Sequence, residues 1–236
     1  MKYSGGLAKK EREDIFGLFL ENHTLKFSQI EKALNIRSNM VAYHLECMQR
    51  EGLLEKKGEH YILAPKAEKY LSVLANITGK EMSPLPVLLV AVANKGKILL
   101  MKRNRRPYRS YWSLIGGKMR FEESFKDAAL RLAREKAGLA ARFGSMNGIL
   151  HERVFGNGIA KHSFILFFVK ASSAGTSFKE SAYGKLAWFN IKQLSKEKVI
   201  PSDMWLIRNK LNKRIDVKSA TMQETEGDLS SFKMIA

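Results

Sequence analysis

The sequence predicts an α+β protein of two domains, on three observations. Up to about residue 80, apolar residues recur at helical spacing, with one short basic hairpin. From Val87 onward, aliphatic runs predict strands around one long helical pattern. Between the two parts, Ser83-Pro84-Leu85-Pro86 has two prolines in three residues, which end a helix and favour extended backbone. We expect domains at 1–82 and 87–214, a linker at 83–86 and a mobile polar tail at 215–236.

The 236 residues are enough for two modest domains. The formal net charge is +18, which favours polyanionic partners such as nucleic acid. The charge is unevenly distributed, because residues 1–80 carry 13 basic and 10 acidic residues (+3) and residues 81–236 carry 28 and 13 (+15). Solvated lysine faces on a generally basic protein are the simpler explanation of this excess.

Neither a signal peptide nor a membrane span is expected. The N-terminus lacks an apolar core with a cleavage signature, and the longest apolar run, 87–93, is too short to cross a bilayer. Cys47 is the only cysteine, so no intrachain disulfide can form. These features predict a cytoplasmic protein.

Residues from about 10 to 63 predict three helices followed by a β-hairpin. The third helix runs from Ser38, its expected N-cap, to about residue 51. Val41, Leu45 and Met48 form its inward stripe. Residues 56–60, which begin with two lysines, form the expected tip of the hairpin.

This order of helices and basic hairpin resembles the winged helix-turn-helix domains of bacterial and archaeal repressors. The resemblance implies that the third helix enters the major groove of double-stranded DNA, with its N-terminal residues nearest the bases. The DNA-binding residues that it implies are Arg37, Ser38, Asn39, Tyr43, Lys56 and Lys57. The two lysines would hold backbone phosphates. A winged helix can also be a protein-interaction module without DNA, and this alternative stays open.

A further helix is expected at about 66–79. Helices after a wing often pair two subunits, which predicts a homodimer. The same apolar stripe can instead pack on its own chain, and both alternatives stay open.

A glycine turn followed by one helix occupies residues 116–139. Apolar residues recur there at helical spacing, and Gly138 stands where a glycine is expected to end the helix. The stretch resembles the Nudix box, whose pattern is G-x5-E-x7-R-E-U-x-E-E-x-G-U with U an aliphatic residue. The matching residues are Gly117, Glu123, Arg131, Glu135, Gly138 and Leu139.

The resemblance extends beyond the box. Strands at 87–93 and 97–103 precede it, Trp112 opens a segment similar to the family's W-x-x-P-G-G-K, and residues 186–194 match a late W-F-x-x-x-x-L segment. Further strands are expected at 149–155 and 163–171, and a last helix through about residue 213. The Nudix family implies an α/β/α sandwich with a mixed sheet for 87–214.

Two positions depart from the Nudix pattern, since Leu132 and Lys136 stand in place of glutamates. In Nudix hydrolases these glutamates share a helix face and hold divalent cations, usually Mg²⁺, against a pyrophosphate. Glu135 alone remains as a weak metal ligand and residual catalytic residue. We therefore expect weak or absent hydrolysis, and a need for Mg²⁺ or Mn²⁺ only if the chain is a working hydrolase.

The ammonium of Lys136 can supply part of the charge that a metal gives to phosphate, which predicts a site that binds a phosphorylated ligand and cuts it slowly or not at all. The family implies that Glu123 and Arg131 brace the loop and helix. Candidate ligand-binding residues are Arg103, Trp112, Gly116, Lys118 and Lys136. For Arg103 a solvated loop, and for Trp112 packing in the core, are open alternatives.

Three functional hypotheses follow. The first is a DNA-binding transcriptional regulator whose Nudix-like domain senses a nucleotide-linked metabolite such as ADP-ribose. The second is an active Nudix pyrophosphohydrolase with an N-terminal regulatory or dimerising domain, and Leu132 and Lys136 argue against it. The third, an RNA-processing enzyme, is suggested only by the charge.

Overall fold

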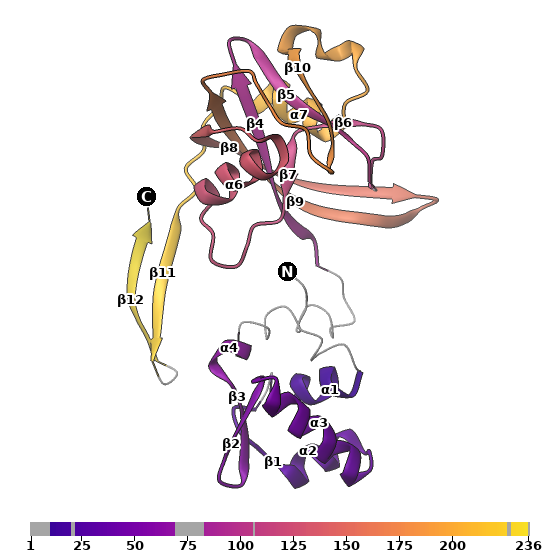
Figure 1. The fold of residues 1–236 in the computed structure, drawn as a ribbon, viewed down its shortest axis with the longest axis vertical. Helices are drawn as coiled ribbons and strands as arrows, with labels where there is room; N and C mark the ends of the chain where they lie inside the picture. The colour runs from indigo at the N-terminus through magenta and orange to yellow at the C-terminus, as the bar shows by residue number, and fades with distance from the viewer. Residues whose placement is uncertain (1–9, 20–21, 69–82, 106, 226–227, 236) are drawn as a thin grey trace. The chain divides into compact units, whose positions relative to one another are not determined.

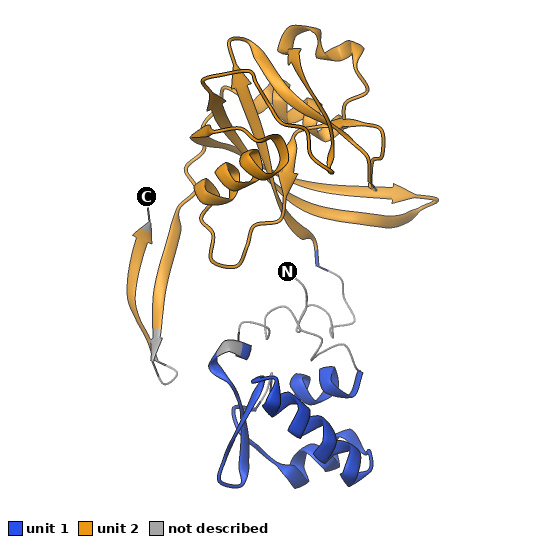
Figure 2. Ribbon diagram, in the orientation of Figure 1, with its two compact units in different colours: residues 1–83 blue, residues 84–236 orange. Residues whose placement is uncertain are grey.

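The computed structural model describes residues 10–19, 22–68, 83–105, 107–225 and 228–235. The chain divides into two compact units, residues 1–83 and 84–236 (Figure 2). Each unit has a hydrophobic core of its own. Among the described residues, no helix is both long and apolar enough to cross a membrane.

The first unit combines helices with a small antiparallel sheet (Figure 1). The helices are α1 (Lys10–Leu18), α2 (Phe27–Leu34), α3 (Ser38–Arg50) and the short α4 (Pro65–Glu68). The strands are β1 (Leu25–Lys26), β2 (Leu54–Lys57) and β3 (His60–Leu63), in the order β1-β3-β2. Phe16, Ile30 and Leu45, one from each of the first three helices, are fully or almost fully buried in one core.

Helix α3 and the hairpin differ in detail from the sequence prediction. Ser38 is the first residue of α3, and Arg37 takes the N-cap position. The Ser38 hydroxyl is hydrogen-bonded to the Glu31 carboxylate of α2, so it links two helices instead of capping one. The turn of the hairpin is Gly58-Glu59, because Gly58 supplies the positive φ (61°) that a two-residue turn needs. Lys56 and Lys57 therefore lie in strand β2, and not in the tip.

The helix expected at 66–79 overlaps the described residues only in α4. The rest of that prediction lies outside the described residues.

The second unit is built on a mixed seven-stranded sheet in the order β10-β5-β4-β9-β8, with β6 paired to β5 and β7 to β4. Its strands are β4 (Leu85–Asn94), β5 (Lys97–Arg103), β6 (Trp112–Ser113), β7 (Ile115–Gly117), β8 (Ala141–Gly156), β9 (Ile159–Ser173) and β10 (Gly184–Asn190). Strands β4 and β9 are parallel, and the other pairs are antiparallel. The expected mixed sheet is confirmed.

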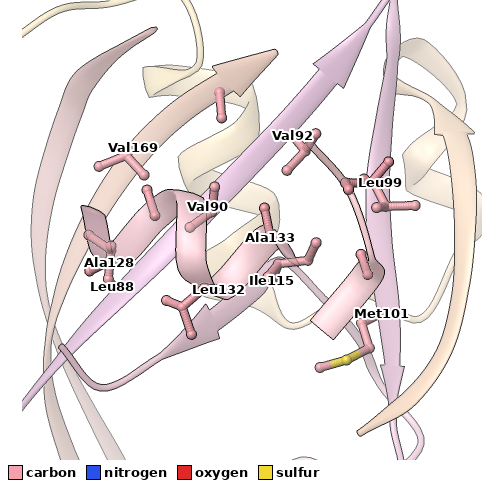
Figure 3. Packing of buried hydrophobic residues seen from close by; sticks show 14 of the residues in the cluster. Leu88, Val90, Val92, Leu99, Met101, Ile115, Ala128, Leu132, Ala133 and Val169 are labelled. Carbon is pink, nitrogen blue, oxygen red and sulfur yellow. The ribbon is translucent and has the colours of Figure 1, made fainter. Parts of the chain in front are cut away.

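Helices cover both faces of this sheet. They are α6 (Phe125–Ala137), the 3₁₀ helix η2 (Ile191–Lys196) and α7 (Pro201–Lys210). Successive side chains of a strand point to opposite faces, so Leu88, Val90 and Val92 of β4 pack in the core beneath α6 (Figure 3). Leu89 and Ala91 pack in the other core, with residues of η2 and α7. The central strand is thus buried on both sides.

The start of two strands and the C-terminal segment differ most from the sequence prediction in the second unit. Strand β4 begins at Leu85, inside the expected linker, and β8 begins at Ala141, eight residues before the expected strand. The C-terminal segment, predicted to be mobile, forms the antiparallel hairpin of β11 (Ser219–Thr225) and β12 (Asp228–Ile235). The alternation of polar and apolar residues along 219–223 is a strand signal that the tail's overall polarity concealed.

Candidate functional site

Helix α6 is fixed at both ends by its sequence. At its start, the Ser124 hydroxyl accepts a hydrogen bond from the backbone N–H of Asp127 (3.1 Å). At its end, Gly138 has φ 62°, which confirms the predicted glycine cap. A Cβ at Gly138 would lie 2.8 Å from the Cβ of Lys179, so packing also requires glycine there. The helix therefore has a defined position against the loop that precedes it.

A partly buried ion pair joins that loop to the helix. The Arg131 guanidinium binds both carboxylate oxygens of Glu123, with Nη2 2.7 Å from Oε2, and donates a further hydrogen bond to the carbonyl of Lys118 (3.1 Å). The hydrogen bond from Arg131 holds the pKa of Glu123 below its usual value. These contacts brace the loop and helix in the way the family resemblance implies.

Glu135, the remaining carboxylate of the metal face, is held by two arginines. Its Oε1 accepts a hydrogen bond from Arg120 Nη2 (2.8 Å), and its Oε2 accepts one from Arg131 Nη1 (3.0 Å). Both oxygens are thus in charge-assisted hydrogen bonds. A metal ion at Glu135 would lie beside two arginine cations, which repel it.

Leu132 and Lys136 occupy the space between α6 and the glycine turn. Leu132 is 2% exposed and belongs to the core in Figure 3. A Cβ at Gly117 would lie 2.7 Å from Leu132 Cδ2 and 3.6 Å from Lys136 Nζ. Lys136 donates a hydrogen bond to the carbonyl of Gly116, and its ammonium lies 4.9 Å from the ring centroid of Tyr183. Burial, followed by the charge of Arg103, lowers the pKa of Lys136 to about 8.

These residues do not fit a Mg²⁺ site. A methyl group and an ammonium fill the space over Gly117, and the oxygens of Glu135 are bound by arginines. In the part of the chain that the structure describes, no three His, Cys, Asp or Glu side chains are grouped so that they could hold a metal ion. Mg²⁺ takes oxygen ligands, and the departures from the Nudix pattern leave Glu135 as the one carboxylate at the three positions of the metal face.

A cavity of about 230 Å³ lies beside the glycine turn. Three basic residues line it: Arg103 at the end of β5, Lys118 after β7, and Lys136 on α6. The apolar part of the wall comes from strands β4 and β9 and includes Leu89 and Phe164. The cavity therefore combines cations with an apolar surface.

The cavity also has acidic and hydroxyl groups. Tyr108 Oη donates a hydrogen bond to Glu152 Oε1 (2.8 Å), and burial, reinforced by this bond, raises the pKa of Tyr108 above its usual range. Asp203 is 3% exposed and its Oδ2 accepts a hydrogen bond from the backbone N–H of Leu114 (2.7 Å). Burial raises the pKa of the Asp203 carboxyl from 3.8 to about 7. The Ser202 hydroxyl oxygen is buried and has no hydrogen-bond partner within the described residues.

The structure brings together four of the five ligand-binding residues expected from the sequence. Gly116 and the three basic residues line the cavity. Trp112 does not line it; its ring lies 4.7 Å from that of Phe189 and packs against the core beside η2 and α7. Sequence reasoning missed Tyr108, Ser202 and Asp203. The proline and acidic residue at the start of α7 mark a helix N-terminus, but nothing local reveals that Asp203 is buried.

The residues expected to contact DNA are exposed in the first unit. They lie at the start of α3, one turn further along it, and on β2: Arg37, Ser38, Asn39, Tyr43, Lys56 and Lys57. A wide surface depression of about 530 Å³ lies beside Asn39 and Tyr43.

Comparison with known proteins supports the family resemblance. The family model described as NUDIX domain matches residues 82–208, more than half of the chain. A relative from Bacillus subtilis (strain 168), described as "Uncharacterized Nudix hydrolase YvcI", is 30% identical over 108 residues. That match covers 45% of this chain and 66% of the relative, just under two thirds of its length.

Solved structures of Nudix proteins are similar to part of the chain. The MutT protein from Bacillus halodurans is 25% identical with a TM-score of 0.48, and the match covers 63% of this chain and 96% of that protein. The NUDIX domain of Shewanella oneidensis NrtR, solved in complex with ADP ribose, is 15% identical with a TM-score of 0.47. This second match covers 60% of this chain and 94% of that domain.

Proposed function

The chain belongs to the Nudix family, and we propose that it is a DNA-binding transcriptional regulator whose Nudix domain binds a nucleotide-linked metabolite without hydrolysing it efficiently. One observation carries this proposal. The metal face of α6 has lost two carboxylates and its third is held by arginines, while the adjacent cavity keeps three basic side chains. A site of this kind retains the means to bind a phosphorylated ligand but lacks the metal site for cutting it.

The cavity lining favours a ligand with an anionic part and a neutral polar part. Basic residues such as Lys118 suit phosphate oxygens, and the apolar wall suits the face of a nucleobase or a sugar. The unpartnered Ser202 hydroxyl and the nearby Asp203 carboxyl offer hydrogen bonds to hydroxyl or amino groups. An ADP-ribose-like molecule has all of these parts, and we propose this class of ligand.

The first unit supports the DNA-binding part of the proposal. Its order α1-β1-α2-α3-β2-β3 fits a winged helix, with α3 as the recognition helix and the β2–β3 hairpin as the wing. Arg37 and Asn39 are exposed at the start of α3, where a recognition helix meets base edges. Lys56 and Lys57 are exposed on the wing, where they can neutralise phosphates.

Regulation requires that the ligand bind the DNA-competent and DNA-incompetent forms with different affinity, because a ligand with equal affinity for both forms shifts no population. We propose that the regulator acts as a homodimer, the usual state for reading a two-fold symmetric site on DNA.

The test is a panel experiment on the full chain. ADP-ribose, NADH, nucleoside triphosphates and dinucleoside polyphosphates are each added with Mg²⁺ or Mn²⁺, and turnover and thermal stabilisation are measured on the same samples. Stabilisation by one ligand without turnover is the expected result. Rapid metal-dependent turnover would instead favour the alternative, a working Nudix pyrophosphohydrolase with an attached regulatory domain.

A second measurement addresses DNA. Random-sequence duplexes are selected on the full chain, and the affinity of any enriched sequence is measured with and without the stabilising ligand. The proposal requires enrichment of a specific sequence and a change in its affinity when the ligand is added. If no sequence is enriched, the first unit is a protein-interaction module.

A further inference from the structure

We propose that the ammonium of Lys136 takes the place of the metal ion, so that the cavity binds phosphate groups without any divalent cation. This inference rests on the proposed function, because it assumes that the cavity binds a phosphorylated ligand. It goes further by naming the group that replaces the metal and by requiring that binding survive complete removal of metal.

Lys136 is held in place in the cavity wall. Its ammonium is hydrogen-bonded to the carbonyl of Gly116 and faces the ring of Tyr183 at 4.9 Å, a cation–π distance. These contacts come from β7 and from the segment before β10, so two separate parts of the chain fix the side chain. An ammonium has three donors, and the carbonyl of Gly116 uses one of them. At least one donor therefore remains for a phosphate oxygen in the cavity.

Lys136 does not form a direct ion pair with the carboxylate next to it in sequence. Glu135 is bound to Arg120 and Arg131, and the structure gives no ion pair between Glu135 and Lys136. Arg103 and Lys118 line the same cavity as Lys136, so cations face it from three parts of the chain. Two cations lining one partly buried cavity repel each other, and a bound anion removes this cost.

The neighbouring cations are placed to act with Lys136. Arg103 donates through Nε to the carbonyl of Pro107 (2.9 Å), which leaves its two terminal nitrogens for other partners. Lys118 follows the glycine turn, and its carbonyl is bound by Arg131. The carboxyl groups of Glu152 and Asp203 repel a phosphate, so an anion is favoured beside the three cations and disfavoured beside the carboxyls. A pyrophosphate, with several charged oxygens, fits this set of donors best.

The experiment compares binding with and without metal. Inorganic pyrophosphate and ADP are titrated by calorimetry into the full chain, once after treatment with a chelating resin and once in Mg²⁺. The wild-type chain, Lys136→Met and Lys126→Met are measured under both conditions. Lys126 lies exposed on the same helix, so Lys126→Met removes the same charge without touching the cavity and controls for the general field of the protein. The melting temperature of each variant reports whether it is folded.

We expect both probes to bind the wild-type chain with the same affinity, within about twofold, with and without Mg²⁺. Loss of a charge-assisted hydrogen bond should weaken binding to Lys136→Met about ten- to a hundredfold, and leave Lys126→Met unchanged. Binding that requires Mg²⁺, equal affinities of Lys136→Met and wild type, or no binding of either probe would each overturn the inference.

The outcome is separable from that of the proposed function. Metal-dependent binding without turnover would refute the role of Lys136 and leave the sensor intact. Metal-free binding through Lys136 combined with rapid turnover in Mg²⁺ would refute the sensor and leave the phosphate site intact.

Discussion

The buried carboxyl of Asp203 predicts a specific dependence of stability on pH. Asp203 is 3% exposed, and burial raises its pKa from 3.8 to about 7. Between about pH 4 and pH 7 the native state therefore holds a proton that the unfolded state has released. The stability that this proton contributes is fully present below the pKa of Asp203 in the unfolded chain. It is lost as the pH rises through the pKa of Asp203 in the native state.

The magnitude follows from the shift. Each pKa unit corresponds to about 1.4 kcal/mol, so a shift from 3.8 to about 7 corresponds to on the order of 4 kcal/mol. Asp203→Asn removes the titration but keeps an oxygen that can accept the hydrogen bond from the Leu114 N–H. We expect the free energy of unfolding of the variant to rise relative to that of the wild type between about pH 4 and pH 7, by on the order of 4 kcal/mol in total.

Urea denaturation followed by tryptophan fluorescence measures this difference. The three tryptophans, Trp112, Trp188 and Trp205, all lie in the second unit, so the signal reports the unit that contains Asp203. Asp216→Asn is the matched control, because that carboxylate is well exposed and should give a difference that does not change with pH. If the difference in free energy of unfolding between Asp203→Asn and wild type is constant over this pH range, the native Asp203 carboxyl is already ionised. Burial then does not raise its pKa, and the prediction is wrong.

Three further predictions use the same chain. Arg131→Met breaks a bidentate, mostly buried ion pair with Glu123. It should lower the free energy of unfolding of the second unit by about 3 kcal/mol in the fluorescence assay. A loss below about 1 kcal/mol would show that the pair does not brace the loop. Gly117→Ala places a Cβ 2.7 Å from Leu132 Cδ2 and should lower the free energy of unfolding by about 1–3 kcal/mol. Adding Leu132→Ala to this variant should recover part of the loss, and a double-mutant cycle measures the coupling. Lys57→Ala should weaken binding to all DNA sequences alike and reduce the slope of log affinity against log salt by about 1, measured by fluorescence anisotropy; an unchanged slope would place the wing away from DNA.

The elements that the sequence predicts best are those set by local chemistry. The spacing of apolar residues and a glycine end signal define α6, and both were visible without the structure. The turn between β4 and β5 is also set locally, since Lys95 and Gly96 both adopt the positive φ that a tight hairpin turn requires. The family resemblance added the mixed sheet.

The cavity could be predicted only in part, because its chemistry depends on residues distant in sequence. Lys136 was recognised as an unusual residue of the box, but its partners Gly116 and Tyr183 lie 20 and 47 positions away. Asp203 reads locally as an ordinary acidic residue in the first turn of a helix, and its pKa is set by burial beneath β6 and β7. Tryptophan is a residue type that often stacks on bases, yet in β6 the ring of Trp112 packs against Phe189.

The tail forms two strands that the sequence analysis did not predict. A two-stranded hairpin has only weak local signals, and the tail is polar in overall composition. The two strands are defined by the hydrogen bonds between β11 and β12, and composition alone does not reveal this pairing.

Phosphorus NMR of ADP-ribose mixed with the full chain and Mg²⁺ is the most direct measurement, because one experiment reports both binding and cleavage. A ligand that is bound but not hydrolysed should show shifted or broadened pyrophosphate signals that persist with time. Replacement of those signals by the signals of two phosphate monoesters would contradict the central claim, since it would mean that a Nudix site with Leu132, Lys136 and an arginine-bound Glu135 still cuts its substrate.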